Sequence, residues 1–188
     1  MRHPCADSIT DSLPRSVTLK SGARMTVRMV TREDHTRIQN AFAHLSDDTR
    51  YMRFLYARQD LPASDIDHLT NWQQRDDVVL GGVIEKSETP VGLARFMRLM
   101  PQGTKAEFAV TVVDAFQGDG AGSHLLYALA TVAEGCGIET FTALIHRNNH
   151  RMRHLLARFE GCSFSFQGME LNASVPVASI LNYEISGT

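Results

Sequence analysis

The sequence predicts an α+β domain with a mixed, mostly antiparallel sheet, and three observations predict it. Two alternating apolar runs near the N-terminus flank a short polar turn. Three further strand-like runs follow one another in mid-chain without an intervening helix, and strands then alternate with helices towards the C-terminus. Strands joined by short turns pair antiparallel, whereas a strand-helix-strand unit contributes a parallel pair.

The first half of the chain predicts a hairpin followed by short helices. The strands Val17–Leu19 and Met25–Val30 flank the turn Lys20–Ala23. The segment Thr31–Asp34 has the spacing of a capping box and predicts a helix that continues to Leu45. Two similar starts predict two more short helices, at Ser46–Thr49 and Ser64–Asp67. Residues 1–14 are expected to form a flexible tail, and residues 15–188 a single domain.

The second half predicts a meander and then a parallel crossover unit. Its elements are three strands at Val78–Ile84, Val91–Met97 and Glu107–Val113, a helix ending near Gly135 or Gly137, a strand at Thr140–Ile145, a helix from Asn149 to Gly161, and strands at Ser163–Gln167 and Val177–Ile185.

Composition excludes several classes of protein. The 188 residues carry a formal charge of −2, and the pI near 6.4 argues against a protein whose main partner is a nucleic acid. The sequence has no apolar run as long as the roughly 18 residues of a membrane span, so no membrane association is expected. Three separated cysteines without a C-x-x-C pair favour free thiols over a disulfide framework or a zinc site, which predicts a cytoplasmic protein.

The segment AFQGDGAGSHLL, residues 115–126, places three glycines at alternate positions directly before an apolar helical pattern. A helix start leaves backbone amides without internal partners and carries the positive end of the helix dipole. Glycine lets a ligand approach that backbone closely. The segment therefore predicts a cradle for a phosphate group.

Two common phosphate loops do not fit this segment. A P-loop has Gly-Lys after a spacer of four residues from its first glycine, and the spacer counted from Gly118 is instead followed by Ser123 and His124. A dinucleotide fingerprint prefers glycine or alanine at position 123 and an acid after the next strand, which instead ends Leu144-Ile145-His146.

The pattern Q/R-x-x-G-x-G/A fits Gln117–Gly122 at every fixed position. It resembles the acetyl-CoA pyrophosphate loop of the GNAT superfamily of N-acetyltransferases, and the flanking strand, the Asn149, Met152 and Leu155 stripe, and Gly161-Cys162-Ser163-Phe164 follow in the family's order. The resemblance extends from about Val17 to Ile185. Leu45–Phe54 with Ala106–Ala109 also resembles the acetyltransferase domain of bacterial Pat-type protein-lysine acetyltransferases.

The resemblance implies a sheet of about six or seven strands, with a central splayed parallel pair and helices on both faces. It implies that the strand before the glycine loop bulges and splays away from its parallel neighbour, leaving free amides for the cofactor. The implied acetyl-CoA contacts are Val110, Val112, Gln117, Gly118, Asp119, Gly120, Ala121, Gly122, Ser123 and Asn149. The valines could equally be core residues, and Asn149 could be only a helix cap.

The implied reaction is direct attack of a primary amine on the thioester carbonyl. Since only about one lysine side chain in a thousand is neutral near pH 7.4, a general base is needed. The resemblance assigns Glu107, expected to be a partly buried carboxylate acting directly or through a water. The tyrosine with which many family members protonate the thiolate is replaced by Leu156, so solvent would supply that proton.

The acceptor is less defined than the cofactor. The Pat-like segments favour a protein lysine, with a small amine as the second choice and a non-catalytic acyl-CoA sensor as the alternative from another class. The resemblance also allows a homodimer. His146, His150 and His154 recur every four residues, but a positive rim with neighbouring arginines, or a solvated helix face, is favoured over a metal site, so no metal is expected.

Overall fold

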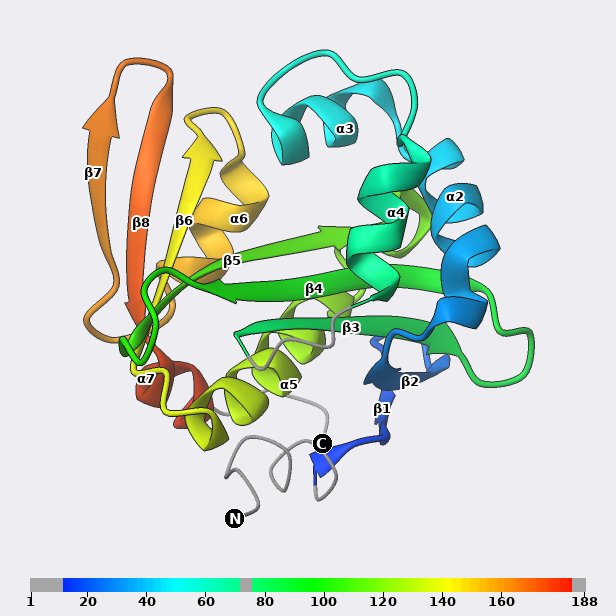
Figure 1. The fold of residues 1–188 in the computed structure, drawn as a ribbon, viewed down its shortest axis with the longest axis horizontal. Helices are drawn as coiled ribbons and strands as arrows, with labels where there is room; N and C mark the ends of the chain where they lie inside the picture. Colours follow the sequence, from blue (N-terminus) through cyan, green and yellow to red (C-terminus); the bar gives the residue numbers. More distant parts are fainter. Residues whose placement is uncertain (1–11, 72–75, 184–188) are drawn as a thin grey trace.

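The sheet has eight strands in the order β1-β2-β3-β4-β5-β6-β8-β7, one more than the upper end of the expected range. These are seen in a computed structural model that describes residues 12–71 and 76–183 (Figure 1). All neighbouring strands pair antiparallel except β5 and β6, which are parallel. The strands are β1 (Arg15–Thr18), β2 (Arg24–Met29), β3 (Asp77–Ile84), β4 (Pro90–Arg98), β5 (Lys105–Val112), β6 (Thr140–His146), β7 (Ser163–Gln167) and β8 (Glu170–Pro176).

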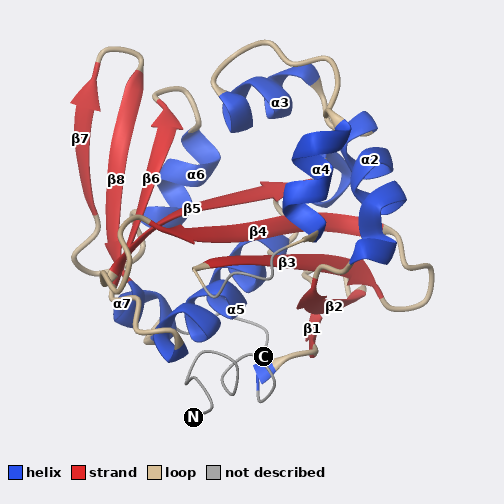
Figure 2. Cartoon of the chain, in the orientation of Figure 1, coloured by secondary structure: helices blue, strands red, loops and turns tan. Residues whose placement is uncertain are grey.

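Helices cover both faces of this sheet, as the fold class predicts (Figure 2). One face carries α5 and α7, and the other carries α2, α3 and α4 over the central strands. The helices are η1 (Arg32–Asp34), α2 (His35–Ala43), α3 (Asp47–Phe54), α4 (Ala63–Thr70), η2 (Asp114–Phe116), α5 (Ala121–Gly135), α6 (His150–Leu156) and α7 (Val177–Leu181).

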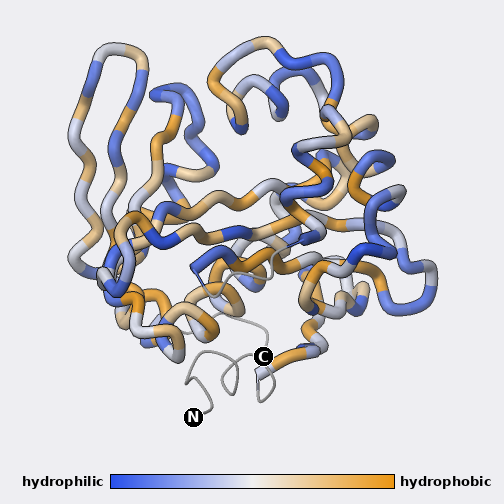
Figure 3. Tube along the Cα trace, viewed as in Figure 1, coloured by the Kyte–Doolittle hydropathy of each residue, from blue (hydrophilic) through white to orange (hydrophobic). Residues whose placement is uncertain are grey.

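Alternation along the central strands separates two apolar cores. In β4, Ala94 and Phe96 belong to the larger core, which includes the buried face of α5, whereas Leu93 packs into a smaller core with Ile38 of α2 and Ile66 of α4. Successive side chains of a strand point to opposite faces, so one strand serves both cores. Figure 3 shows the resulting concentration of hydrophobic residues along the central strands and α5.

The parallel pair is joined over only a short stretch. Lys105–Glu107 of β5 lie opposite Thr140–Thr142 of β6, and beyond these residues the two strands separate. Figure 1 shows β5 and β6 diverging as the two arms of a V. The register of β5 against β4 runs without a shift from Ala106 to Val112. The expected splay is therefore present, but the expected bulge in β5 is not.

Four local expectations differ from the structure or lie outside it. Val177–Ile185 was expected as a strand, but β8 ends at Pro176, and α7 follows because Val177 and Ile180 have helical spacing and both are buried. The third short helix begins at Ala63 rather than at a Ser64 cap. Cys162 is a free thiol, whereas Cys136 is disulfide-bonded, contrary to expectation. Most of the expected tail, residues 1–11, lies outside the described residues.

Candidate functional site

The glycine loop between η2 and α5 presents a run of unoccupied backbone amides. Gly118 and Gly120 have φ angles of +81° and +93°, a region that glycine enters without steric cost. Within the described residues, the amides of residues 118–122 donate no hydrogen bond to the protein, whereas those of Ser123 and His124 donate to the Gly120 carbonyl at 3.0 and 3.2 Å. Such a run at the start of a 15-residue helix favours an anion.

The side chain of Asp119 binds the protein rather than extending the run of free amides. Its carboxylate accepts hydrogen bonds from the Ser21 amide and hydroxyl, and its carbonyl accepts from the Lys20 amide at 3.0 Å. The turn between β1 and β2 therefore holds the glycine loop from outside. Since the sequence analysis placed only residues of the second half at this loop, it missed Lys20 and Ser21.

The free edge of β5 supplies a second set of amides. The Leu99 amide bonds to the Lys105 carbonyl at 3.0 Å, and the Val113 amide bonds to the Val91 carbonyl at 2.9 Å. These bonds direct the odd-numbered positions of β5 towards β4. The amides of Val110 and Val112 consequently face the opening beyond the short β5–β6 pairing.

The side chain of Gln117 connects the elements around this opening. Its Nε2 donates to the Val112 carbonyl at 2.9 Å and to the Thr49 hydroxyl of α3 at 3.1 Å, while its Oε1 accepts from Arg151 of α6. Asn149 is the N-cap of α6 and accepts from the Met152 amide at 3.0 Å. Gln117 and Asn149 are predicted from the sequence, and Arg151 is one of the arginines of the predicted positive rim, but no sequence pattern indicates the contact with Thr49.

Asp114 fixes α3 over the opening. Its carboxylate accepts from the Ser46 amide at 2.9 Å, the Ser46 hydroxyl at 2.7 Å and the Thr49 hydroxyl at 2.9 Å. Burial acts to raise the pKa of Asp114, but these hydrogen bonds outweigh it and hold the pKa below its ordinary value. At its other end α3 reaches β6, where Tyr51 packs edge-on against the buried His146, with ring centroids 5.2 Å apart.

Glu107 lies at the apex of the V, opposite Thr142 of β6. Its side chain is on the face of β5 that carries Ala109 and Thr111, and it is exposed rather than partly buried. Leu156, which replaces the family's tyrosine, is fully buried in the larger core. The opening thus has the carboxylate of Glu107 beside it, whereas position 156 provides no side chain that could act as an acid.

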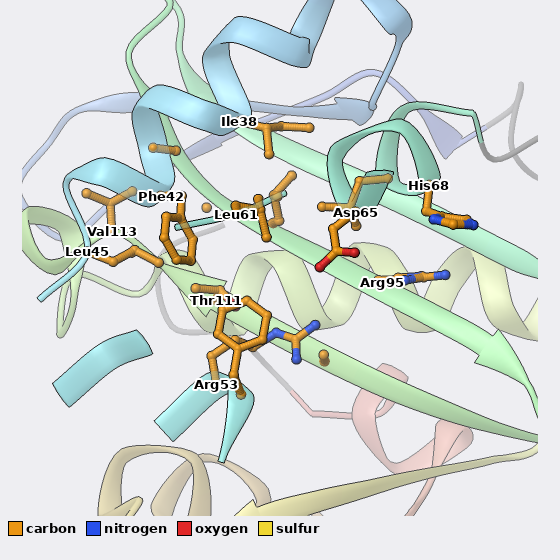
Figure 4. Close-up of a pocket in the computed structure, with 16 residues that line it drawn as sticks. Ile38, Phe42, Leu45, Arg53, Leu61, Asp65, His68, Arg95, Thr111 and Val113 are labelled. Carbon is orange, nitrogen blue, oxygen red and sulfur yellow. The ribbon is translucent and has the colours of Figure 1, made fainter. Parts of the chain in front are cut away.

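A cavity of about 310 Å³ lies over Ala109 and Thr111, on the face of β5 to which Glu107 also belongs. It is enclosed by α2, α3 and α4 over β4 and β5, and Figure 4 shows Phe42, Leu45 and Leu61 on one side and Asp65, His68 and Arg95 on the other. The guanidinium of Arg53, from α3, points between these two groups (Figure 4). Nothing in the sequence pattern indicated Arg53.

An ion network anchors α2, which forms one wall of this cavity. Asp34, 4% exposed, accepts from Arg28 through two bonds of 2.7 Å, from Arg37 at 2.9 Å and from the Thr31 amide at 2.9 Å. Burial alone would raise the pKa of Asp34, but these donors hold it far below its ordinary value. The capping box expected from the sequence is present in these contacts.

Metal sites and membrane-spanning helices are two further features to consider in the described residues. Among residues 12–71 and 76–183, no group of three or more His, Cys, Asp or Glu side chains is arranged to hold a metal ion. In the same residues, no helix has the length and apolar character needed to cross a membrane.

Comparison with known proteins agrees with this geometry. Residues 24–160 match the model of the Acetyltransferase (GNAT) domain. Acetyltransferase Pat of Mycolicibacterium smegmatis is 32% identical over 152 residues, covering 77% of this chain but only 43% of the relative. The chain thus spans less than half the length of that protein.

Solved structures show the same fold. The GNAT domain of S. lividans PAT superposes with a TM-score of 0.80 at 27% identity, covering 86% of this chain and 96% of that one. Spermidine N-acetyltransferase from Vibrio cholerae, solved with CoA and spermine, has a TM-score of 0.63 at 16% identity over 84% of this chain and 98% of that one. The match over residues 24–160 establishes that this chain belongs to the GNAT family of acetyltransferases, which are acyltransferase enzymes.

Proposed function

We propose that the protein binds acetyl-CoA and transfers its acetyl group to a primary amine by direct attack. The observation that carries the proposal is the run of unoccupied amides at residues 118–122, next to the free β5 edge of Val110 and Val112. The loop amides would hold the pyrophosphate, and the strand amides would hold the pantetheine arm and polarise the thioester carbonyl. Gln117, Ser123 and Asn149 would complete the cofactor contacts.

Glu107 is the proposed general base. It lies at the apex of the V and faces the cavity side of β5, so an amine entering from the cavity would meet its carboxylate beside the thioester. Solvent would protonate the leaving thiolate, since Leu156 is buried and cannot donate a proton.

Two classes of acceptor remain under this proposal. The resemblance to Pat-type protein-lysine acetyltransferases favours a protein lysine, whereas the cavity on the Glu107 face of β5 favours a small amine. The non-catalytic alternative, an acyl-CoA-binding module, makes a different prediction: it would bind CoA but release none from acetyl-CoA with any amine.

Release of CoA from acetyl-CoA, measured against a panel of amines and lysine peptides, tests the proposal. Glu107→Gln should lower kcat/KM by about 100-fold at pH 7, and the deficit should shrink as the pH approaches the pKa of the amine. Glu160→Gln is the matched control, because Glu160 is exposed after α6 and away from the V. A full rate for Glu107→Gln at pH 7 would disprove the base assignment.

A further inference from the structure

The cavity contains one guanidinium that has no acidic partner. Arg53 makes no ion pair and no hydrogen bond within the described residues, and its guanidinium lies over the neighbouring Phe54 ring, 5.0 Å from the centroid. Burial lowers the pKa of Arg53, as does the positive charge of Arg95, whereas the charge of Glu107 raises it. A partly buried cation without a counter-ion loses part of its hydration, which is costly unless something compensates it.

The other charged side chains that line the cavity already have partners. Arg95 makes a two-bond ion pair with Asp77, at 2.7 and 2.5 Å. Asp65 is paired with Arg58. Among the described residues, Glu107 is the carboxylate whose charge raises the pKa of Arg53, although the two side chains form no ion pair. The cavity therefore offers one unpaired positive charge close to one unpaired carboxylate.

The rest of the lining is mostly apolar. The volume of about 310 Å³ is at the lower end of the range for small-ligand sites. Large apolar side chains come from α2, α3, β4 and the segments between the helices: Ile38, Phe42, Leu45, Phe54, Leu61 and Leu93. A ligand filling this space would present an apolar group to the helices and an anion to Arg53.

We propose that the acceptor is an amine that also carries a carboxylate and an apolar side chain, with the carboxylate bound by Arg53. The inference rests on the proposed function for the role of Glu107, and it selects among the acceptors. An amino acid presents its amine and its carboxylate only a few bonds apart, which matches the neighbouring charges of Glu107 and Arg53. The planar guanidinium can bind a carboxylate through two bonds. A polyamine would bring a second positive charge towards Arg53, and a lysine side chain would leave Arg53 without a counter-ion.

A binding experiment tests the Arg53 site without requiring catalysis. 3-Phenylpropionate and 3-phenylpropanamide have nearly the same shape, and only the first has a negative charge. By calorimetry on the full chain, the acid should bind at least 10-fold more tightly than the amide. Arg53→Gln should remove this preference, Arg53→Lys should retain part of it, and Arg158→Gln, an exposed charge-matched control, should leave it intact.

A second variant tests the cavity in case the Arg53 variants do not fold. Ala41→Leu, on the α2 wall of the cavity, should weaken binding of both compounds while Arg53 stays in place. Equal affinities of the wild-type chain for acid and amide, or a preference that survives Arg53→Gln in a folded variant, would overturn the proposal.

Kinetics then separate this inference from the proposed function. With L-phenylalanine and 2-phenylethylamine as acceptors, kcat/KM should favour the amino acid by at least 10-fold. Arg53→Gln should raise KM for phenylalanine at least 10-fold more than it raises KM for phenylethylamine. Arg53-dependent acid binding without CoA release from any amine would refute the proposed function alone. CoA release without a carboxylate preference would refute the acceptor class alone.

Discussion

The carboxylate of Asp119 accepts hydrogen bonds from both the amide and the hydroxyl of Ser21, at 2.7 and 2.6 Å. These two contacts join the glycine loop to the turn between β1 and β2. The loop amides are therefore held in position by a residue 98 positions away in the sequence. The side chain of Asp119 therefore positions the loop, while its backbone amide stays in the run that would bind the pyrophosphate.

Asp119→Ala should weaken CoA binding although the substitution leaves the backbone amide of residue 119 in place. Loss of hydrogen bonds to a charged group at an exposed site costs about 1 kcal/mol, so the Kd for CoA should rise by about 5-fold. Calorimetry checks this, with Ser87→Ala as control, because the Ser87 hydroxyl bonds within the distant β3–β4 turn. An unchanged Kd would show that the loop keeps its shape without Ser21.

Substitutions at two loop glycines should differ in effect. Gly120 has a φ of +93°, so Gly120→Ala forces an unfavourable backbone conformation that costs about 1–2 kcal/mol. A Cβ at Gly122 would lie 3.6 Å from Val112 Cγ2, which is an ordinary contact, and its φ is not positive. Calorimetry with CoA should show about 10-fold weaker binding for Gly120→Ala and nearly unchanged binding for Gly122→Ala. Equal losses would contradict the cradle geometry.

Gly92 should be among the least replaceable glycines of the sheet. A Cβ there would lie 2.4 Å from the Thr111 carbonyl oxygen and 3.1 Å from Leu125 Cδ1. Because the backbone of β5 cannot yield without disturbing its pairing with β4, Gly92→Ala should destabilise the protein by about 3 kcal/mol. Gly81→Ala meets only a side chain, Val30 Cγ2 at 3.3 Å, and should cost less than about 1 kcal/mol. Urea denaturation compares the two variants.

Asp34 should make the stability of the protein depend on pH in the acid range. Its folded-state pKa is held far below the ordinary 3.8, so its contribution is complete above that pH. The contribution is lost as the pH falls from about 3.8 towards the folded-state pKa, since protonation removes the acceptor for Arg28 and Arg37. Asp34→Asn should lower the free energy of unfolding at pH 7 by about 3 kcal/mol.

The same substitution should flatten the fall in stability between pH 4 and pH 2, as followed by urea denaturation at several pH values. Asp47→Asn provides the control, because the Asp47 carboxylate is fully exposed and its one ion pair, with Arg50, is long at 3.8 Å. If Asp34→Asn lost stability between pH 4 and pH 2 as steeply as the parent protein, Asp34 would not be the cause of the pH dependence.

The parts of the fold that local patterns encode could be predicted from sequence. The β1–β2 hairpin, the β3–β4–β5 meander and the glycine-to-α5 junction depend on turns and periodicities within a few residues, and all appear in the structure. The last strand was misplaced, since Val177 and Ile180 after Pro176 are buried at helical spacing. The better signal was in β8, where Leu171, Ala173 and Val175 are buried at every second position.

Only part of the candidate site could be predicted from the sequence, because only part of it is local in the chain. The glycine loop is continuous in the chain, so its pattern is visible. The importance of Arg53 depends on which acids are left unpaired after α3, α4, β3 and β4 come together, and Asp65 and Asp77 are paired with Arg58 and Arg95. The spacing of residues in the sequence does not predict which charged side chains will pair after folding.

The short pairing of β5 with β6 also affects how the backbone should exchange hydrogen with solvent. Three residue pairs join a five-stranded half of the sheet to a three-stranded half. Amides of β5 past Glu107 that face β6 lack a partner strand, so they should exchange quickly in the free protein. A cofactor lying between the arms would behave as an added strand, slowing exchange at Val110 and Val112 and stiffening the junction between the halves.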